Sequence, residues 1–309
     1  MVWFCICANA YTRLSPETKH FVSVHGDLGY STLIHSIDNQ SAPAGLNTNL
    51  GIDYRLFHNN FLFSIGAEGM YGLYSNSLDG IEETIPMMDT EGDLFDMHAV
   101  LDHPRDYAHM VNVNLPLLVG GEWGSFYFLV GPKLSLNMYG ATSSSAAVTT
   151  YGEYDRYYDD FYDMVNHQFE TARPISSGVL PMKWNMNVLA HLEIGGRVDD
   201  YPDNQGFQAR KEKVRVYLAG YVDFGVLNLK SGSTGTPLFQ YRETDQGLKF
   251  YVQPLLLSSL SDNAVVRNLS VGLKLTCAFR VAEQGKSYKY DSRRVKTNYR
   301  KRGGTQALY

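Results

Sequence analysis

Carboxylates and imidazoles are concentrated in one stretch of this 309-residue sequence. Hard divalent cations prefer carboxylate ligands and transition metals accept imidazole, so such a stretch could hold a metal ion. The spacing matches no fixed ligand pattern, and a solvated acidic loop over 81–106, with eight acids and one base, explains the same residues. We therefore predict no metal site, and the candidates to examine are Asp96, His98, Asp102 and His103.

Catalytic motifs are not found. The sequence contains no G-x-S-x-G, and no Ser–His pair has a diagnostic arrangement. His25 and His191 each alternate with apolar neighbours, which fits members of a satisfied polar network better than catalytic bases. We predict that the protein is not an enzyme and uses no cofactor.

A second set of ionisable residues occupies every other position in segments that are otherwise apolar. Five acids and six bases make this set nearly balanced. Charges that are buried must be paired, so we predict an internal network of salt bridges. The set consists of Asp27, Asp53, Glu68, Glu193 and Asp223 with Arg55, Lys133, Arg197, Arg215, Lys274 and Arg280.

Strict alternation of apolar and polar residues predicts the elements that carry these charges. It is clearest in 269–281, where Leu273 and Leu275 oppose Lys274. Each segment is about 12–16 residues long, whereas strands of soluble domains have about 5–6. Eight segments are predicted as strands: 20–34, 45–57, 61–76, 107–121, 126–139, 184–197, 214–226 and 269–281.

The connections between these strands alternate in length. The second and fourth are very short, whereas 77–106 and 140–183 are long. Short turns on one side and long loops on the other are typical of a transmembrane barrel. The predicted fold is all-β, an up-and-down antiparallel transmembrane β-barrel of eight strands. We expect 247–259 to form a further strand that rises within the last outer loop.

Composition narrows the class of protein. Hydrophobic residues make up 44% and charged residues 19%, and the net charge of −5 gives no basic field for nucleic acid. No apolar run approaches the roughly 18–20 residues of a membrane helix. Small and amide residues on the polar face suit a narrow interior, and eight strands leave just enough room for side chains. We therefore predict a filled lumen.

Both ends of the chain differ from the middle. Residues 2–10 form a short apolar stretch that ends Ala8-Asn9-Ala10, which favours 1–10 as the end of a cleaved signal peptide. We predict the barrel over 11–282 and a basic periplasmic tail over 283–309. The tail has eight bases and two acids, a net +6. Like-charged polar runs are usually interaction tails, so Lys286 to Arg302 could bind a periplasmic partner.

The chain resembles the PorT-like outer-membrane β-barrel proteins of Gram-negative bacteria. The resemblance rests on the signal-like start, the strand rhythm and the stretches 45-GLNTNLGIDYRLF, 126-FYFLVGPKLSLNM and 268-NLSVGLKLTCAFRV. It implies an outer-membrane location, with lipid and lipopolysaccharide as surroundings, and in some relatives a role in protein secretion. It implies no catalytic residues.

The leading hypothesis is a non-enzymatic outer-membrane barrel that serves as an anchor, an adhesin or a component of envelope or secretion assembly. An alternative is a secreted, soluble, lipocalin-like barrel whose apolar face points inward and binds a small apolar ligand. A barrel-embedded hydrolase is a more distant alternative. The sidedness of the apolar residues separates the first two.

Overall fold

The computed structural model describes most of the chain between residues 18 and 284. The predicted signal peptide and all but the first two residues of the predicted tail lie outside the described residues. Among the described residues, no helix is long and apolar enough to span a bilayer. The described ranges are 18–36, 40–41, 45–78, 80–89, 91–153, 172–198, 213–230, 235–245 and 247–284.

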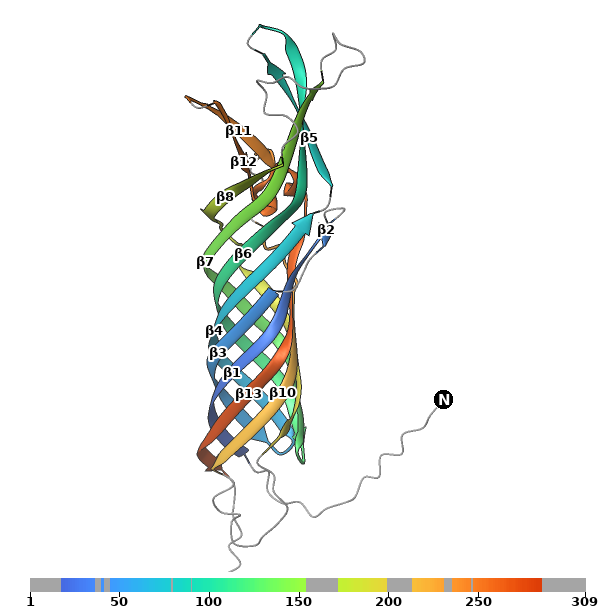
Figure 1. The fold of residues 1–309 in the computed structure, drawn as a ribbon. Coiled ribbons are helices and arrows are strands. Elements are labelled where there is room, and N and C mark those ends of the chain that lie inside the picture. Colours follow the sequence, from blue (N-terminus) through green and yellow to red (C-terminus); the bar gives the residue numbers. More distant parts are fainter. Residues whose placement is uncertain are drawn as a thin grey trace, which may run out of the picture.

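Eight long strands form a closed antiparallel ring (Figure 1). Each strand pairs with the next one in the ring, and β13 pairs with β1 to close it. The predicted barrel class and all eight predicted strands are thereby confirmed. In ring order the strands are β1 (Thr18–His35), β3 (Gly45–His58), β4 (Phe61–Leu78), β6 (Leu94–Trp123), β7 (Phe126–Glu153), β9 (Asn187–Arg197), β10 (Val214–Gly225) and β13 (Val266–Gln284).

The two ends of the barrel differ. At one end, here called the turn end, the connections β3–β4 and β6–β7 are tight turns, in which Asn59 (φ 54°) and Gly124 (φ 62°) adopt the left-handed conformation. The described chain also starts and finishes at this end, where Thr18 pairs with both His58 and Gln284. The opposite end is called the collar end.

At the collar end, β6 and β7 continue well beyond the ring (Figure 1). With 30 and 28 residues at about 3.4 Å each, they are several times longer than the roughly 25 Å apolar layer of an outer membrane. Much of the predicted loops 77–106 and 140–183 is therefore strand. The collar consists of 94–106 of β6, 141–153 of β7, β5 (Ile81–Met88), β8 (Arg173–Pro181), β11 (Phe239–Thr244) and β12 (Gly247–Val252).

The last outer loop contains more than the strand that the sequence predicts. Only 247–252 of the predicted strand 247–259 is extended, and it pairs with β11 as a hairpin outside the ring. Pro254 ends the extended run, and two 3-10 turns follow, η1 (Leu255–Leu257) and η2 (Ser259–Ser261). The remaining strand, β2 (Gln40–Ser41), pairs with the collar end of β4.

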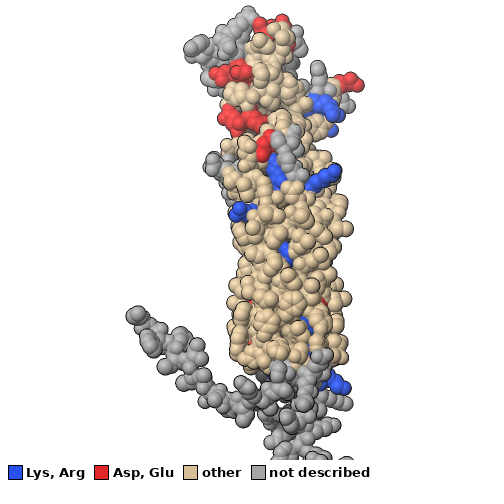
Figure 2. Space-filling view, turned by 180° about the vertical axis from the view of Figure 1, so that it is seen from behind, with Lys and Arg blue, Asp and Glu red and all other residues tan. Residues whose placement is uncertain are grey.

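The apolar face of the barrel points outward. Leu50, Ile52, Leu273 and Leu275 are 51–70% exposed, whereas Lys274 between the last two is 3% exposed. Figure 2 shows the barrel body with few charged side chains on the visible face, and acidic groups at the collar. This arrangement is the reverse of a lipocalin-like barrel, so that alternative is wrong. An exterior of this kind belongs in lipid.

Alternation fails at one place on β7. Tyr139 occupies an odd-numbered position, like the inward-facing Lys133 and Ser135, so alternation predicts that it faces the lumen. A register shift opposite Val111 and Asn112 turns it outward instead, to 55% exposure. A bulge of this kind moves every following side chain to the other face. The sequence therefore shows which residues of a strand face the lumen only up to the first bulge of that strand.

Apolar clusters close the lumen at both ends. At the turn end, Phe21, Phe57, Tyr127 and Tyr217 belong to one buried cluster. At the collar end, Leu256 of η1 packs in a second cluster with side chains of the ring and of the loops at this end. The second cluster also includes Leu33, Met70, Tyr74, Met110, Trp184 and Val266.

Candidate functional site

The centre of the lumen holds a closed circuit of charged and imidazole side chains. His25 links Asp53 (2.6 Å) to Glu68 (3.2 Å), and Lys133 links Glu68 (2.9 Å) to Asp223 (3.1 Å). His191 then links Asp223 (2.6 Å) to Glu193 (3.3 Å), and Arg55 links Glu193 (3.9 Å) back to Asp53 (2.6 Å). None of these side chains is more than 4% exposed. We call this set the lumen ring.

The barrel strands position the ring from all sides of the lumen. Its members come from β1, β3, β4, β7, β9 and β10, each at an inward-facing position. Space is created at Gly51, where a Cβ atom would lie 2.6 Å from His25 Nε2 and 2.7 Å from the Glu68 side chain. Glycine at this position is therefore required for the contact between His25 and Glu68.

The charges of the central lumen are unequal. Five buried acids, the four of the ring and Asp27, face three permanent cations, Arg55, Lys133 and Lys274, which gives 3 − 5 = −2 with neutral imidazoles. Lys274 contacts Glu193 Oε2 at 2.9 Å. With all five carboxylates ionised, the sum reaches zero when both imidazoles are protonated. A buried set of this kind requires a partner for every member.

The structure brings together most of the eleven predicted lumen residues. Seven of them, Asp53, Arg55, Glu68, Lys133, Glu193, Asp223 and Lys274, lie in or on the ring. Asp27 is adjacent and accepts hydrogen bonds from Asn49 Nδ2 (2.7 Å) and the Tyr221 hydroxyl (3.0 Å). Arg280 is half-buried near the turn end of β13.

Arg197 and Arg215 lie apart from the ring, at the turn end. Arg215 Nη1 lies 3.1 Å from Glu122 Oε1, and Arg197 Nη1 lies 3.5 Å from the same atom. The guanidinium of Arg215 also lies 4.8 Å from the ring centroids of both Phe21 and Phe57. This second, smaller group helps to close the turn end.

Sequence reasoning overlooked several partners of these charges. Glu122 lies between the predicted strands 107–121 and 126–139, but β6 extends to Trp123 and carries it inward. The hydroxyls of Tyr127, Tyr217 and Tyr221 donate to Glu193, Glu122 and Asp27, respectively. The alternation of the strands places these tyrosines on the lumen face, and this was the signal that could have identified them. It is a weak signal because aromatic residues are common on both faces of a barrel.

The four metal candidates do not converge. Asp96 is exposed on the collar, and His103 contacts its own neighbour Asp102 at 3.4 Å. His98 lies between Glu82 (2.8 Å) and Glu153 (3.2 Å) and stacks on Tyr151. Across the part of the chain that the structure describes, no group of three or more His, Cys, Asp or Glu side chains could hold a metal ion.

Asp106 from the same stretch has a structural partner instead. Its carboxylate accepts hydrogen bonds from the Ser144 hydroxyl (2.5 Å) and from the backbone N–H of Leu255, the first residue of η1. Asp106 is 4% exposed, and burial raises its pKa to about 7. This residue attaches the 3-10 turns that close the collar end.

Comparison with known proteins gives no match to a family model and none to a curated protein. Solved structures of low similarity include the attachment invasion locus protein Ail of Yersinia pestis in complex with sucrose octasulfate (10% identity, 85% of this chain, 99% of Ail, TM-score 0.23). They also include the outer-membrane protease OmpT of Escherichia coli (8% identity, 88% of this chain, 99% of OmpT, TM-score 0.31). A third is the translocator domain of the autotransporter NalP of Neisseria meningitidis (8% identity, 87% of this chain, 90% of the NalP domain, TM-score 0.18).

At these scores the likenesses carry no argument about function. The closed ring and the apolar exterior themselves establish the architecture of an outer-membrane β-barrel. The prediction that the protein is not an enzyme is wrong as an exclusion, because the barrel class includes a protease.

Proposed function

We propose that the protein is an outer-membrane anchor that presents the collar at the cell surface, as an adhesin or as a component of envelope or secretion assembly. One observation carries the proposal. The barrel has an apolar exterior and a charged lumen that is closed at both ends, and it continues into a folded extension at the collar end only. The barrel would hold the protein in lipid and lipopolysaccharide, and the collar would meet the partner.

Two finer proposals accompany it. Membership of the PorT-like family is supported by the three quoted stretches, which fall on β3, β7 and β13. A periplasmic partner for Lys286 to Arg302 is supported by the +6 charge of the tail and by the end of β13 at the turn end. Capture of periplasmic proteins with the full chain and with a chain ending at Gln284 would test the second.

The orientation can be tested by labelling intact cells with a membrane-impermeant maleimide. In a cysteine-free background, Asp93→Cys, in the turn between β5 and β6 at the collar end, should be labelled on intact cells. Asn60→Cys, in the tight turn at the opposite end, should be labelled only after the outer membrane is opened. The reverse pattern would overturn the proposed orientation, and recovery of both variants as soluble protein would overturn the membrane anchor.

Heat-modifiable migration on semi-native gels gives an independent check of the barrel. Folded transmembrane barrels keep a compact form in detergent until they are boiled. Both cysteine variants should show the mobility shift of the unsubstituted protein, so that a labelling difference reports location and not misfolding.

A further inference from the structure

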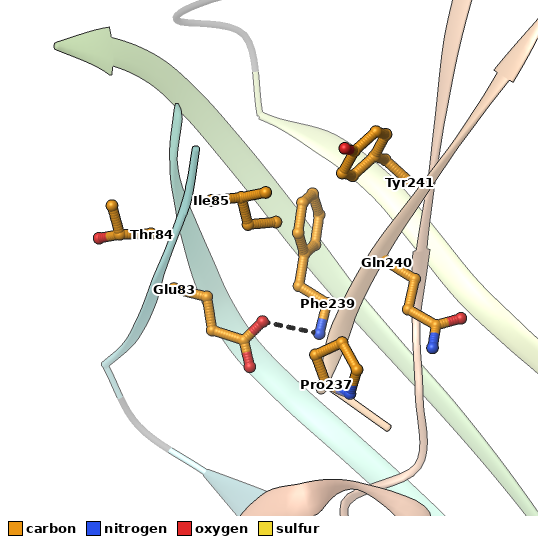
Figure 3. A pocket seen from close by; sticks show the side chains of 7 residues that line it. All are labelled: Glu83, Thr84, Ile85, Pro237, Phe239, Gln240 and Tyr241. Atoms are coloured by element: carbon orange, nitrogen blue, oxygen red, sulfur yellow. Dashed lines mark hydrogen bonds between the residues drawn. The ribbon is translucent and has the colours of Figure 1, made fainter. Parts of the chain in front are cut away.

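The collar is a small two-layer structure. A sheet made of β5, the outer parts of β6 and β7, and β8 faces the hairpin β11–β12, with Phe95, Met97, Phe239 and Phe250 in the core between them. On the β5 side the two layers separate and leave a cleft of about 420 Å³ (Figure 3). Its lining residues are Glu83, Thr84, Ile85, Pro237, Phe239, Gln240 and Tyr241.

Two open sheet edges border this cleft. Among the described strands, β5 pairs only with β6, and β11 pairs only with β12. The strands do not pair with each other, because the Glu83 side chain lies between them and accepts hydrogen bonds from the N–H groups of Leu238 (3.2 Å) and Phe239 (3.0 Å). A glutamate side chain therefore spans the gap between the two strands.

Pro86 indicates which backbone groups of β5 face the gap. A proline within a strand is found where its missing N–H would point away from the neighbouring strand. Pro86 lies opposite Asp96 of β6, so its backbone faces away from β6. Glu82 and Thr84 share this direction because hydrogen-bonding direction alternates along a strand. They offer N–H and C=O groups to an added strand, and Pro86 ends the ladder.

Side chains on the two faces of β5 differ in chemistry. Ile85 points toward Phe239 inside the cleft, whereas Thr84 points to the other side of the strand (Figure 3). On that outer face, Glu82 accepts hydrogen bonds from Tyr151 (2.7 Å) and from His98 (2.8 Å). The Tyr151 hydrogen bond holds the pKa of Glu82 below its usual value, so the carboxylate is charged.

Acidic residues predominate in the segment that contains β5. Residues 81–106 contain eight acids and one base, Arg105. A strand added to β5 would place one of its outer-face side chains beside Glu82, where opposite charges attract across a strand pair. Its inner-face side chains would lie over Ile85 and Phe239, where apolar groups are favoured.

We propose that the β5–β11 cleft binds an extended segment of a partner polypeptide, with alternating basic and apolar side chains, as a strand added to β5. This inference rests on the proposed function, since the collar must be accessible to a partner. Main-chain hydrogen bonds to Glu82 and Thr84 would supply affinity, and the alternation of basic and apolar residues would supply specificity.

The test measures fluorescence anisotropy of a labelled peptide of alternating Lys and Val with the detergent-refolded full chain. Saturable binding is expected. Thr84→Pro removes an outward N–H and should weaken binding about tenfold, the loss of one or two hydrogen bonds. Thr84→Val, the matched control, keeps the backbone and should bind as the unsubstituted chain does. Heat-modifiable migration verifies that both variants are folded.

A second probe leaves the protein unchanged. The same peptide with alternate amides methylated keeps its charge and side chains but cannot form the ladder, and it should not bind. A Glu–Val peptide should also fail to bind. Equal binding of the methylated peptide, equal binding of the acidic peptide, or no saturable binding of the Lys–Val peptide would each overturn the proposal. Self-association that β5 substitutions abolish would assign the edge to a second copy and overturn it too. Because the protein is refolded, these results are independent of its location in cells.

Discussion

Removal of one cation should destabilise the barrel from its centre. Lys133 Nζ contacts Glu68 Oε1 at 2.9 Å and Asp223 Oδ2 at 3.1 Å, and these carboxylate side chains are 0% and 4% exposed. Lys133→Met keeps the length and packing of the side chain but removes its charge. With neutral imidazoles, the sum of the central charges falls from −2 to 2 − 5 = −3.

The size of the effect follows from burial. Breaking a buried ion pair by removing one partner costs about 3–5 kcal/mol, because the other charge stays buried without compensation. Here two carboxylates lose the same partner, although His25 and His191 still contact them. We therefore expect a loss of about 3–5 kcal/mol in the free energy of unfolding.

Urea unfolding in detergent, followed by the loss of the compact gel form, measures this quantity. Lys249→Met on the exposed face of β12 is the matched control and should change stability by less than about 0.5 kcal/mol. Adding Asp223→Asn to Lys133→Met should restore part of the loss, because one uncompensated charge is removed. A Lys133→Met variant within about 1 kcal/mol of the unsubstituted chain would refute the account of the ring.

Three further predictions concern the exterior, the collar and the packing of the lumen. Leu273→Arg, at a 64% exposed position, should cost about 2–4 kcal/mol in lipid and reduce insertion into vesicles, and normal insertion would contradict the outward assignment. Because burial raises the pKa of Asp106 from 3.8 to about 7, its contribution to stability is fully present below pH 4 and is lost as the pH rises to 7. Proteolysis of 254–264 should accordingly be faster at pH 8 than at pH 5, and Asp106→Asn, which resembles the protonated form, should remove this difference. Gly51→Ala should separate His25 from Glu68 and lower the urea midpoint, whereas Gly69→Ala, with only ordinary contacts, should not.

The sequence predicted the ring of strands well because a membrane barrel repeats one simple rule. Every strand must present apolar groups to lipid and polar groups to the lumen, so alternation alone identifies β3 and β10 over nearly their whole length. The collar follows no such rule. Its strands are covered on one face by β11–β12, a contact between distant segments that local alternation cannot indicate.

Bulges and strand ends account for the remaining errors. Tyr139 faces outward because a register shift inverts the alternation of the residues that follow it, and Glu122 faces the lumen because β6 ends at Trp123, two residues after the predicted end. The lumen charges were recognisable as a set of acids and bases, but neither their pairing nor the excess of acids at the centre was. Lys133 of β7 pairs with Asp223 of β10, and this contact depends on the tilt of the strands and not on sequence distance.

The closed lumen limits where a partner can act. Apolar clusters lie at both ends of the charged centre, and the His–Asp pairs of the ring are at most 4% exposed, so a substrate entering from either side would have to displace packed side chains. The collar has the opposite character, since its cleft joins two strand edges that are open among the described strands to charged side chains that water already reaches. Interaction with a partner therefore costs least at the collar, where no buried ion pair has to be broken. A lumen that is packed at both ends and whose central charges contact one another is suited to hold that surface in place.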